Sequence, residues 1–221
     1  MRILRSCALM LVLAFLFQGS ALAVTDSGAE SSSTSCFAPN TDDTGDGFLT
    51  TIFAQNNNFA GNSFDIIAST DLTVVGFDVN LDTNLPSWTV QVWTRAGTAD
   101  GFEQSATGWT LLGTDVVVGA GSDLPTHVNV GGLSMLNGET VGVIITVVEA
   151  VASVGGFFYT NGGPNTYSNA EMSVITYRGL SDGFPPGSVF TYRAWNGTVH
   201  YDFDTALDQE SWGFIKTDYS D

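Results

Sequence analysis

Apolar and polar residues alternate with a period of two along most of this chain, between segments rich in Gly, Asn, Asp and Pro. Successive side chains of a β-strand point to opposite faces, so this alternation is typical of strands with one buried face. Residues 139–149 are the clearest case, with Val141, Val143, Ile145 and Val147 on one face. No segment shows the sustained period of 3.6 residues that an amphipathic helix needs. The pattern therefore predicts an all-β fold.

The same alternation predicts about ten or eleven short strands in all. Besides 139–149, they are expected near 49–54, 63–69, 71–81, 88–95, 109–119, 126–131, 154–160, 171–178, 188–194 and 198–204. Many short strands with no helix between them cannot form a parallel α/β sheet, whose strands need long crossover connections. The predicted fold is therefore a two-sheet antiparallel β-sandwich, jelly-roll-like in topology.

In two further strands the side chains that share a face can be predicted residue by residue, because alternate side chains lie on opposite faces. The strand at 71–81 is expected to place one set of side chains together on one face, Thr73, Val75, Phe77, Val79 and Leu81. The strand at 198–204 is expected to point three side chains inward, Val199, Tyr201 and Phe203. His200 and Asp202 are then expected on its outward face.

Two Asn-Gly pairs mark expected turns. Asn196-Gly197 stands between two predicted strands, and both residue types tolerate the positive φ angles of a two-residue hairpin turn. Asn137-Gly138, directly before the strand at 139–149, is a second signal of this kind. Both pairs are therefore interpreted as hairpin turns.

The first residues predict an exported protein. Arg2 and Arg5 precede an apolar run over 7–17, and Ala-Leu-Ala at 21–23 has the small residues that signal peptidase recognises. The run is well short of the roughly 20 residues that cross a bilayer, so a membrane anchor is not expected. Residues 1–23 are predicted to be a cleaved signal peptide. The predicted location is secreted or extracellular, with the periplasm or the cell surface as alternatives.

The rest of the chain divides by composition. Residues 24–47 are rich in Ser, Thr, Asp and Gly and nearly free of aliphatic side chains, which predicts an acidic linker. Residues 48–204 contain the alternating strands and are predicted to form one β-sandwich domain. The alternation stops after 204, so 205–221 is interpreted as a C-terminal tail. Cys36 is the single cysteine after residue 23, so no intramolecular disulfide is expected.

The charge of the chain restricts its partners. Six basic and 23 acidic residues give a formal net charge of −17 at pH 7. Such a charge repels phosphate backbones and anionic headgroups, so neither nucleic acid nor a membrane surface is an expected partner. The charge attracts cations, and it also keeps an exported protein soluble.

Several short segments resemble a β-sandwich domain that recurs in bacterial secreted and cell-surface proteins. They are GNSFDI (61–66), VGFDVN (75–80), VQVW (90–93), TGWTLLG (107–113), GETVG (138–142), YTNG (159–162) and RAWNGTVHY (193–201). The resemblance spans most of the chain from 48 to 204. The family has no established reaction, so the resemblance implies an extracellular accessory module and assigns no site residue.

Motifs for catalysis are weak. Residues 179–183 match the G-x-S-x-G pattern of serine hydrolases, which requires a turn from a strand into a helix. Pro185 and Pro186 follow directly and forbid that helix. A jelly-roll glycosidase needs two carboxylates facing one groove, but the alternating acidic residues beside His200 include no glutamate. We therefore expect no catalytic residues.

The alternative class is a carbohydrate-active enzyme on a jelly-roll scaffold, either a polysaccharide lyase or a glycosidase. Tyr192, Arg193 and His200 include residue types that lyases combine. Arg and Lys are too scarce, however, to line a cleft for an anionic sugar. The sequence therefore favours a protein that is not an enzyme.

Calcium is the strongest cofactor signal. The segment TDDTGDG at 41–47 places Asp42, Asp43 and Asp46 in one short loop with two glycines. Ca²⁺ takes six to eight oxygen ligands, which such a loop can supply from carboxylates and carbonyls. The competing interpretation is a flexible acidic linker without a bound ion. His200 with Asp202 is a weaker candidate for a transition metal.

Aromatic side chains supply the candidate ligand-binding residues. Trp88 and Trp93 have opposite parity on the strand at 88–95, so one of them must point away from the main core. An exposed aromatic ring on a sheet can stack on a sugar, although surface loops usually cover such rings. We select Trp93, with Tyr177 and Tyr192, as candidate ligand contacts. The expected function is a non-catalytic module with a glycan-binding or a structural and adhesive role, whose partner is an extracellular glycan or another surface protein.

Overall fold

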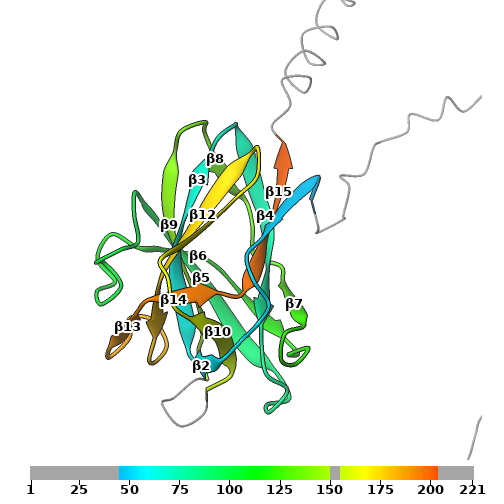
Figure 1. The fold of residues 1–221 in the computed structure, drawn as a ribbon, viewed down its shortest axis with the longest axis vertical. Coiled ribbons are helices and arrows are strands. Elements are labelled where there is room, and N and C mark those ends of the chain that lie inside the picture. Colours follow the sequence, from blue (N-terminus) through cyan, green and yellow to red (C-terminus); the bar gives the residue numbers. More distant parts are fainter. Residues whose placement is uncertain (1–44, 150–154, 204–221) are drawn as a thin grey trace, which may run out of the picture. The chain divides into compact units, whose positions relative to one another are not determined.

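The computed structural model describes residues 45–149 and 155–203, which contain fifteen strands and no helix (Figure 1). This confirms the all-β prediction. The strands are β1 Gly47–Thr50, β2 Asn57–Phe59, β3 Gly61–Ala68, β4 Leu72–Asn80, β5 Trp88–Ala96, β6 Thr110–Val117, β7 Pro125–Val128, β8 Leu133–Met135, β9 Thr140–Val147, β10 Phe157–Asn161, β11 Asn165–Ser168, β12 Met172–Leu180, β13 Val189–Thr191, β14 Arg193–Trp195 and β15 Gly197–Phe203. Within these residues, no helix has the length and apolar character to cross a membrane.

The strands form two larger sheets and one small one. The five-stranded sheet has the order β1-β15-β4-β7, with β8 also paired to β4. The seven-stranded sheet has the order β11-β12-β3-β9-β5-β6, with β13 also paired to β12. The small sheet has the order β14-β10-β2. The strand pairs of all three sheets are antiparallel.

The connectivity is that of a jelly roll. β5 pairs with β6 and β3 with β9 in the seven-stranded sheet, while β4 pairs with β7 and β1 with β15 in the five-stranded sheet. The chain therefore alternates between the sheets from β3 to β4, from β4 to β5, from β6 to β7 and from β8 to β9. These nested pairs correspond to one long hairpin rolled over two sheets, which confirms the predicted antiparallel sandwich.

The main core contains the inward faces of the two larger sheets. On β9, four side chains that were predicted to share one face are all buried in it, namely Val141, Val143, Ile145 and Val147. On β5, Trp88, Val90 and Val92 are likewise buried. Full burial of a side chain of this size contributes about 1.5–3 kcal/mol, so the core is the main stabilising feature of this domain.

The predicted grouping of Thr73 and Val75 with the later side chains on one face of β4 is wrong. Leu72 and Val74 are buried there, whereas Thr73 and Val75 are partly exposed. Tyr201 of β15 pairs with Val74 and His200 pairs with Gly76, so Val75 is an extra residue on β4. A bulge of this kind changes which side chains face inward.

After the bulge, Phe77, Val79 and Leu81, which were predicted to share one face, are all buried. Val199 and Tyr201 on β15 are also buried, but Phe203 at the strand's end is 37% exposed, against the prediction.

The prediction of a hairpin at Asn196-Gly197 is also wrong. β14 before this pair belongs to the small sheet and β15 after it belongs to the five-stranded sheet, so the chain passes between sheets here. Gly197 is required for a different reason, because a Cβ atom at this position would lie 2.0 Å from Cζ2 of Trp195.

Asn137-Gly138 does form a turn. Gly138 has a φ of +83°, and the amide of Glu139 donates to the carbonyl of Leu136 at 2.9 Å. This turn joins β8 to β9 in different sheets, so the hairpin part of the prediction is wrong.

A second apolar cluster lies on the outer face of the seven-stranded sheet. Ile144 of β9, whose neighbours in sequence face the main core, packs there with Ala99, Trp109 and Leu180. Trp93 and Phe184 are partly buried against this cluster. The segments between β5 and β6 and between β12 and β13 therefore cover this face.

Candidate functional site

The register of the five-stranded sheet places four polar side chains in one row across its outer face. Thr50 pairs with Thr198, Thr198 with Asp78, and Asp78 with His127. Side chains directly opposite on antiparallel strands have Cβ atoms about 5 Å apart. Because Phe77 and Val79 of β4 face the core, Asp78 between them faces outward. His200 lies two residues beyond Thr198 on the same face of β15.

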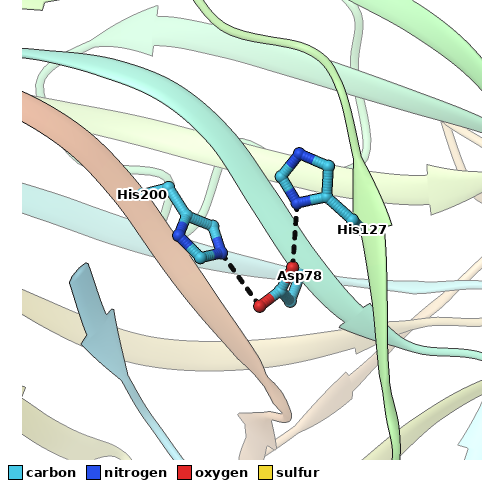
Figure 2. A group of neighbouring side chains, drawn as sticks. All are labelled: Asp78, His127 and His200. Carbon is cyan, nitrogen blue, oxygen red and sulfur yellow. Dashed lines mark hydrogen bonds and ion pairs between the residues drawn. The ribbon is translucent and has the colours of Figure 1, made fainter. Parts of the chain in front are cut away.

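Both histidines of the chain bond to the same carboxylate (Figure 2). Nδ1 of His127 lies 3.0 Å from Oδ1 of Asp78, and Nε2 of His200 lies 2.9 Å from Oδ2. The two imidazole rings have centroids 5.3 Å apart and planes inclined at 69°. The Asp78–His127–His200 cluster therefore joins three adjacent strands, β7, β4 and β15.

The cluster is shielded but open to solvent on one side. The side chains of Asp78, His200 and His127 are 16%, 11% and 33% exposed, respectively. Burial alone would raise the pKa of the Asp78 carboxyl, but hydrogen bonds from His200 and His127, together with their positive charge, lower this pKa overall. Asp78 is therefore a carboxylate near neutral pH, and it accepts a hydrogen bond from each imidazole.

A shallow pocket of about 330 Å³ lies beside the cluster. Asp78 and His200 contribute to its lining, along with apolar side chains and two threonines, namely Phe48, Phe53, Pro125, Thr50 and Thr198. The hydroxyls of Thr50 and Thr198 are 3.0 Å apart and hydrogen-bonded. Phe48 is 66% exposed, which is unusual for a large aromatic side chain. The pocket thus combines an exposed ring with hydroxyl, imidazole and carboxylate groups.

A second pocket lies beside the segment between β5 and β6. The guanidinium of Arg95 stands 3.4 Å from the ring centroid of Phe102, and both residues line this pocket. The arginine donates a hydrogen bond from one terminal nitrogen to the carbonyl of Thr98. This pocket is formed largely by a connecting segment rather than by paired strands.

The predicted ligand contacts lie at three separate places. Trp93 is on β5, and its ring packs 5.2 Å from that of Phe184 while its indole N–H donates to Gln91. Tyr177 is on β12, separated from β5 by β3 and β9, and its hydroxyl donates to Asp65. Tyr192 lies between β13 and β14 and is 51% exposed. As ligand contacts, all three remain predictions.

The predicted calcium loop falls mostly outside the described residues. Asp42 and Asp43 lie outside them. Asp46 is described, and its backbone amide donates to Oδ1 of Asp202 at 3.1 Å. The calcium site therefore also remains a prediction.

Sequence reasoning missed the Asp78–His127–His200 cluster. It grouped His200 with Asp202, the carboxylate two residues away, whereas the structure pairs His200 with Asp78, 122 residues away. One sequence signal was present, because the chain has two histidines and each lies on a strand with alternating polar residues. Their convergence depends on the strand order, which the sequence pattern does not contain.

A comparison with protein-family models and with curated proteins finds no match for this chain. The resemblance to the recurrent β-sandwich domain therefore stays an expectation. The fold and the geometry of the Asp78–His127–His200 cluster are the basis for the functional proposal.

Proposed function

We propose that this chain is a secreted, non-catalytic β-sandwich module that binds an extracellular glycan on the outer face of its five-stranded sheet. The observation that carries the proposal is the pocket beside Phe48. A sugar ring has an apolar C–H face and a rim of hydroxyls. The exposed Phe48 ring can pack against the C–H face. The Thr50, Thr198 and His200 side chains can hydrogen-bond to the sugar hydroxyls.

This pocket lies on paired strands, which supports it as the glycan-binding site in preference to the pocket beside Phe102. Thr198 and Asp78 sit in the middle of a sheet, where the register fixes their spacing. Sites built on strands hold their geometry more precisely than sites on loops. The net charge of −17 also favours a neutral glycan over an anionic one.

The positions of two buried carboxylates, those of Asp65 and Glu103, support the proposal that the module has no catalytic activity. Asp65 accepts hydrogen bonds from the Ala99 amide and the Tyr177 hydroxyl. Glu103 accepts from the Ser63 hydroxyl at 3.0 Å and lies 3.2 Å from Nε of Arg178. Both carboxylates are buried and hold the segment between β5 and β6 on the sheet. Neither faces an open groove, as a glycosidase would require.

A glycan array with the wild-type chain and three aromatic variants tests the proposal. Phe48→Ala is expected to abolish binding, because it removes the ring that a sugar would cover. Phe102→Ala, at the second pocket, and Trp93→Ala, on the other sheet, are matched controls that are expected to retain binding. Loss of binding in either control but not in Phe48→Ala would move the site to the other sheet. No glycan bound by the wild type would favour the structural and adhesive role.

A further inference from the structure

We propose that Asp78, His127 and His200 form a binding site for one divalent transition-metal ion, with Zn²⁺ as the representative ion. This inference goes beyond the glycan-binding proposal and does not depend on it. It concerns a different ligand, and its test uses no glycan.

The spacing of the three donors is that of a metal site. The ligand atoms of Asp78, His127 and His200 all lie within 4.8 Å of one another. Ligands at the Zn–N and Zn–O distances of about 2.0–2.2 Å are separated from one another by roughly 3–3.5 Å in a tetrahedral site. The two nitrogen-to-oxygen distances of 3.0 and 2.9 Å are close to this range. Small side-chain adjustments would therefore admit an ion between the donors.

The chemistry of the donors selects the class of metal. Two imidazoles and one carboxylate suit zinc and related first-row ions, whereas Ca²⁺ and Mg²⁺ prefer oxygen ligands alone. The negative net charge of the chain also raises the local concentration of cations.

The imidazole of His127 can take the tautomer that a metal requires. A metal bound at Nδ1 of His127 needs the ring proton on Nε2, and Nε2 has no hydrogen-bond partner among the described residues. Among the described residues, the change of tautomer therefore breaks only the hydrogen bond between Nδ1 of His127 and Asp78. The pocket beside Asp78 and His200 leaves room for water or a ligand atom to complete the coordination.

The alternative is a hydrogen-bonded cluster that only joins three strands and binds no ion. Zinc titration calorimetry on the full chain, purified with a chelator, distinguishes the two. Cys36→Ser serves as the background, because a thiolate is itself a zinc ligand. The variants are Asp78→Asn, His127→Gln and His200→Gln, and Asp202→Asn is the control for loss of a carboxylate on the same strand face. Circular dichroism establishes that each variant is folded.

We expect one equivalent of zinc to bind, with affinity at least about tenfold weaker in each ligand variant, because loss of even an outer hydrogen-bond partner weakens metal binding by about 10- to 100-fold. Asp202→Asn should bind as the background does, and excess Ca²⁺ should not displace zinc. If a variant fails to fold, the wild-type chain still tests the proposal. Co²⁺ bound at this site should give the visible absorption of a nitrogen- and oxygen-ligated ion. Absence of both zinc binding and the cobalt spectrum, or zinc affinity equal in all folded variants, would overturn the proposal.

Discussion

The indole ring of Trp195 lies flat against the phenyl ring of Phe64, with centroids 4.2 Å apart and planes inclined at 9°. Trp195 ends β14 in the small sheet, and Phe64 is in the middle of β3 in the seven-stranded sheet. Both side chains are fully buried, and Phe77 of the five-stranded sheet contacts the same indole edge-on at 6.3 Å. The three sheets therefore meet at Trp195.

We expect Trp195→Ala to lower the free energy of unfolding by about 3–5 kcal/mol, the range for removing a large aromatic from a core. Urea denaturation followed by fluorescence or circular dichroism measures this change. Phe203→Ala, at a partly exposed aromatic on β15, is the control and should cost much less. Equal losses in the two variants would mean that Trp195 does not join the sheets.

Gly197→Ala is expected to destabilise the domain by about 1–3 kcal/mol, because the added methyl group would overpack the site. The Cβ atom would meet both the Trp195 ring and, at 2.6 Å, the carbonyl oxygen of Asp78. Gly183→Ala is the matched control, since the nearest atom to its Cβ would be 3.7 Å away. Thermal melts of the two variants should differ clearly, and similar melting temperatures would contradict the packing described for Gly197.

The buried carboxyl of Asp65 predicts a specific pH dependence. Burial raises its pKa above the ordinary value of 3.8, and hydrogen bonds from Ala99 and Tyr177 offset this only in part. Between 3.8 and the raised pKa, the folded state binds more protons than the unfolded state, so this group's contribution to stability falls as pH rises. Asp65→Asn removes that contribution. The stability of the variant relative to wild type should therefore increase from pH 3 to pH 7, as measured by urea denaturation. A constant or decreasing difference would contradict the predicted shift.

The acidic loop predicts a calcium effect on thermal stability. If Asp42, Asp43 and Asp46 bind Ca²⁺ in the folded chain, the ion stabilises it by mass action, by about 2.7 kcal/mol at one hundred times the dissociation constant. Melting temperatures in CaCl₂ should then exceed those in MgCl₂ at matched ionic strength. Generic screening of the −17 charge would raise both equally. Equal shifts of the melting temperature in the two salts would show that Asp42, Asp43 and Asp46 do not form a calcium site.

The fold class could be predicted from the sequence because the period of two is a local property. The alternation correctly groups the inward residues of β5 and of β9, because no bulge interrupts the pairing of these two strands with each other. The first half of β4 could not be predicted, because the extra residue Val75 is defined only by its pairing with β15. Likewise, Asn196-Gly197 has the residue types of a hairpin turn, but the glycine is required there by the close approach of the Trp195 ring.

The candidate site was less predictable for the same reason. His127 lies 49 residues from Asp78 in sequence, and His200 lies 122 residues from it. Only the order β15-β4-β7 brings the three together. The position of Trp93 was predicted in part. The alternation indicated that either Trp88 or Trp93 points away from the main core. It could not indicate that Phe184, from a distant segment, packs against Trp93.

The central claim is that both imidazoles bond to the Asp78 carboxylate, and nitrogen-15 NMR of the two imidazoles tests it most directly. The signals report on this site alone because the chain has no other histidine. Because a carboxylate can only accept hydrogen bonds, His127 should carry a proton on Nδ1 and His200 on Nε2, the atoms that bond to Asp78. Asp78→Asn should shift both imidazoles together, and Asp182→Asn, in the segment between β12 and β13, should shift neither. Two imidazoles that do not respond to Asp78→Asn, or only one that does, would contradict a shared site.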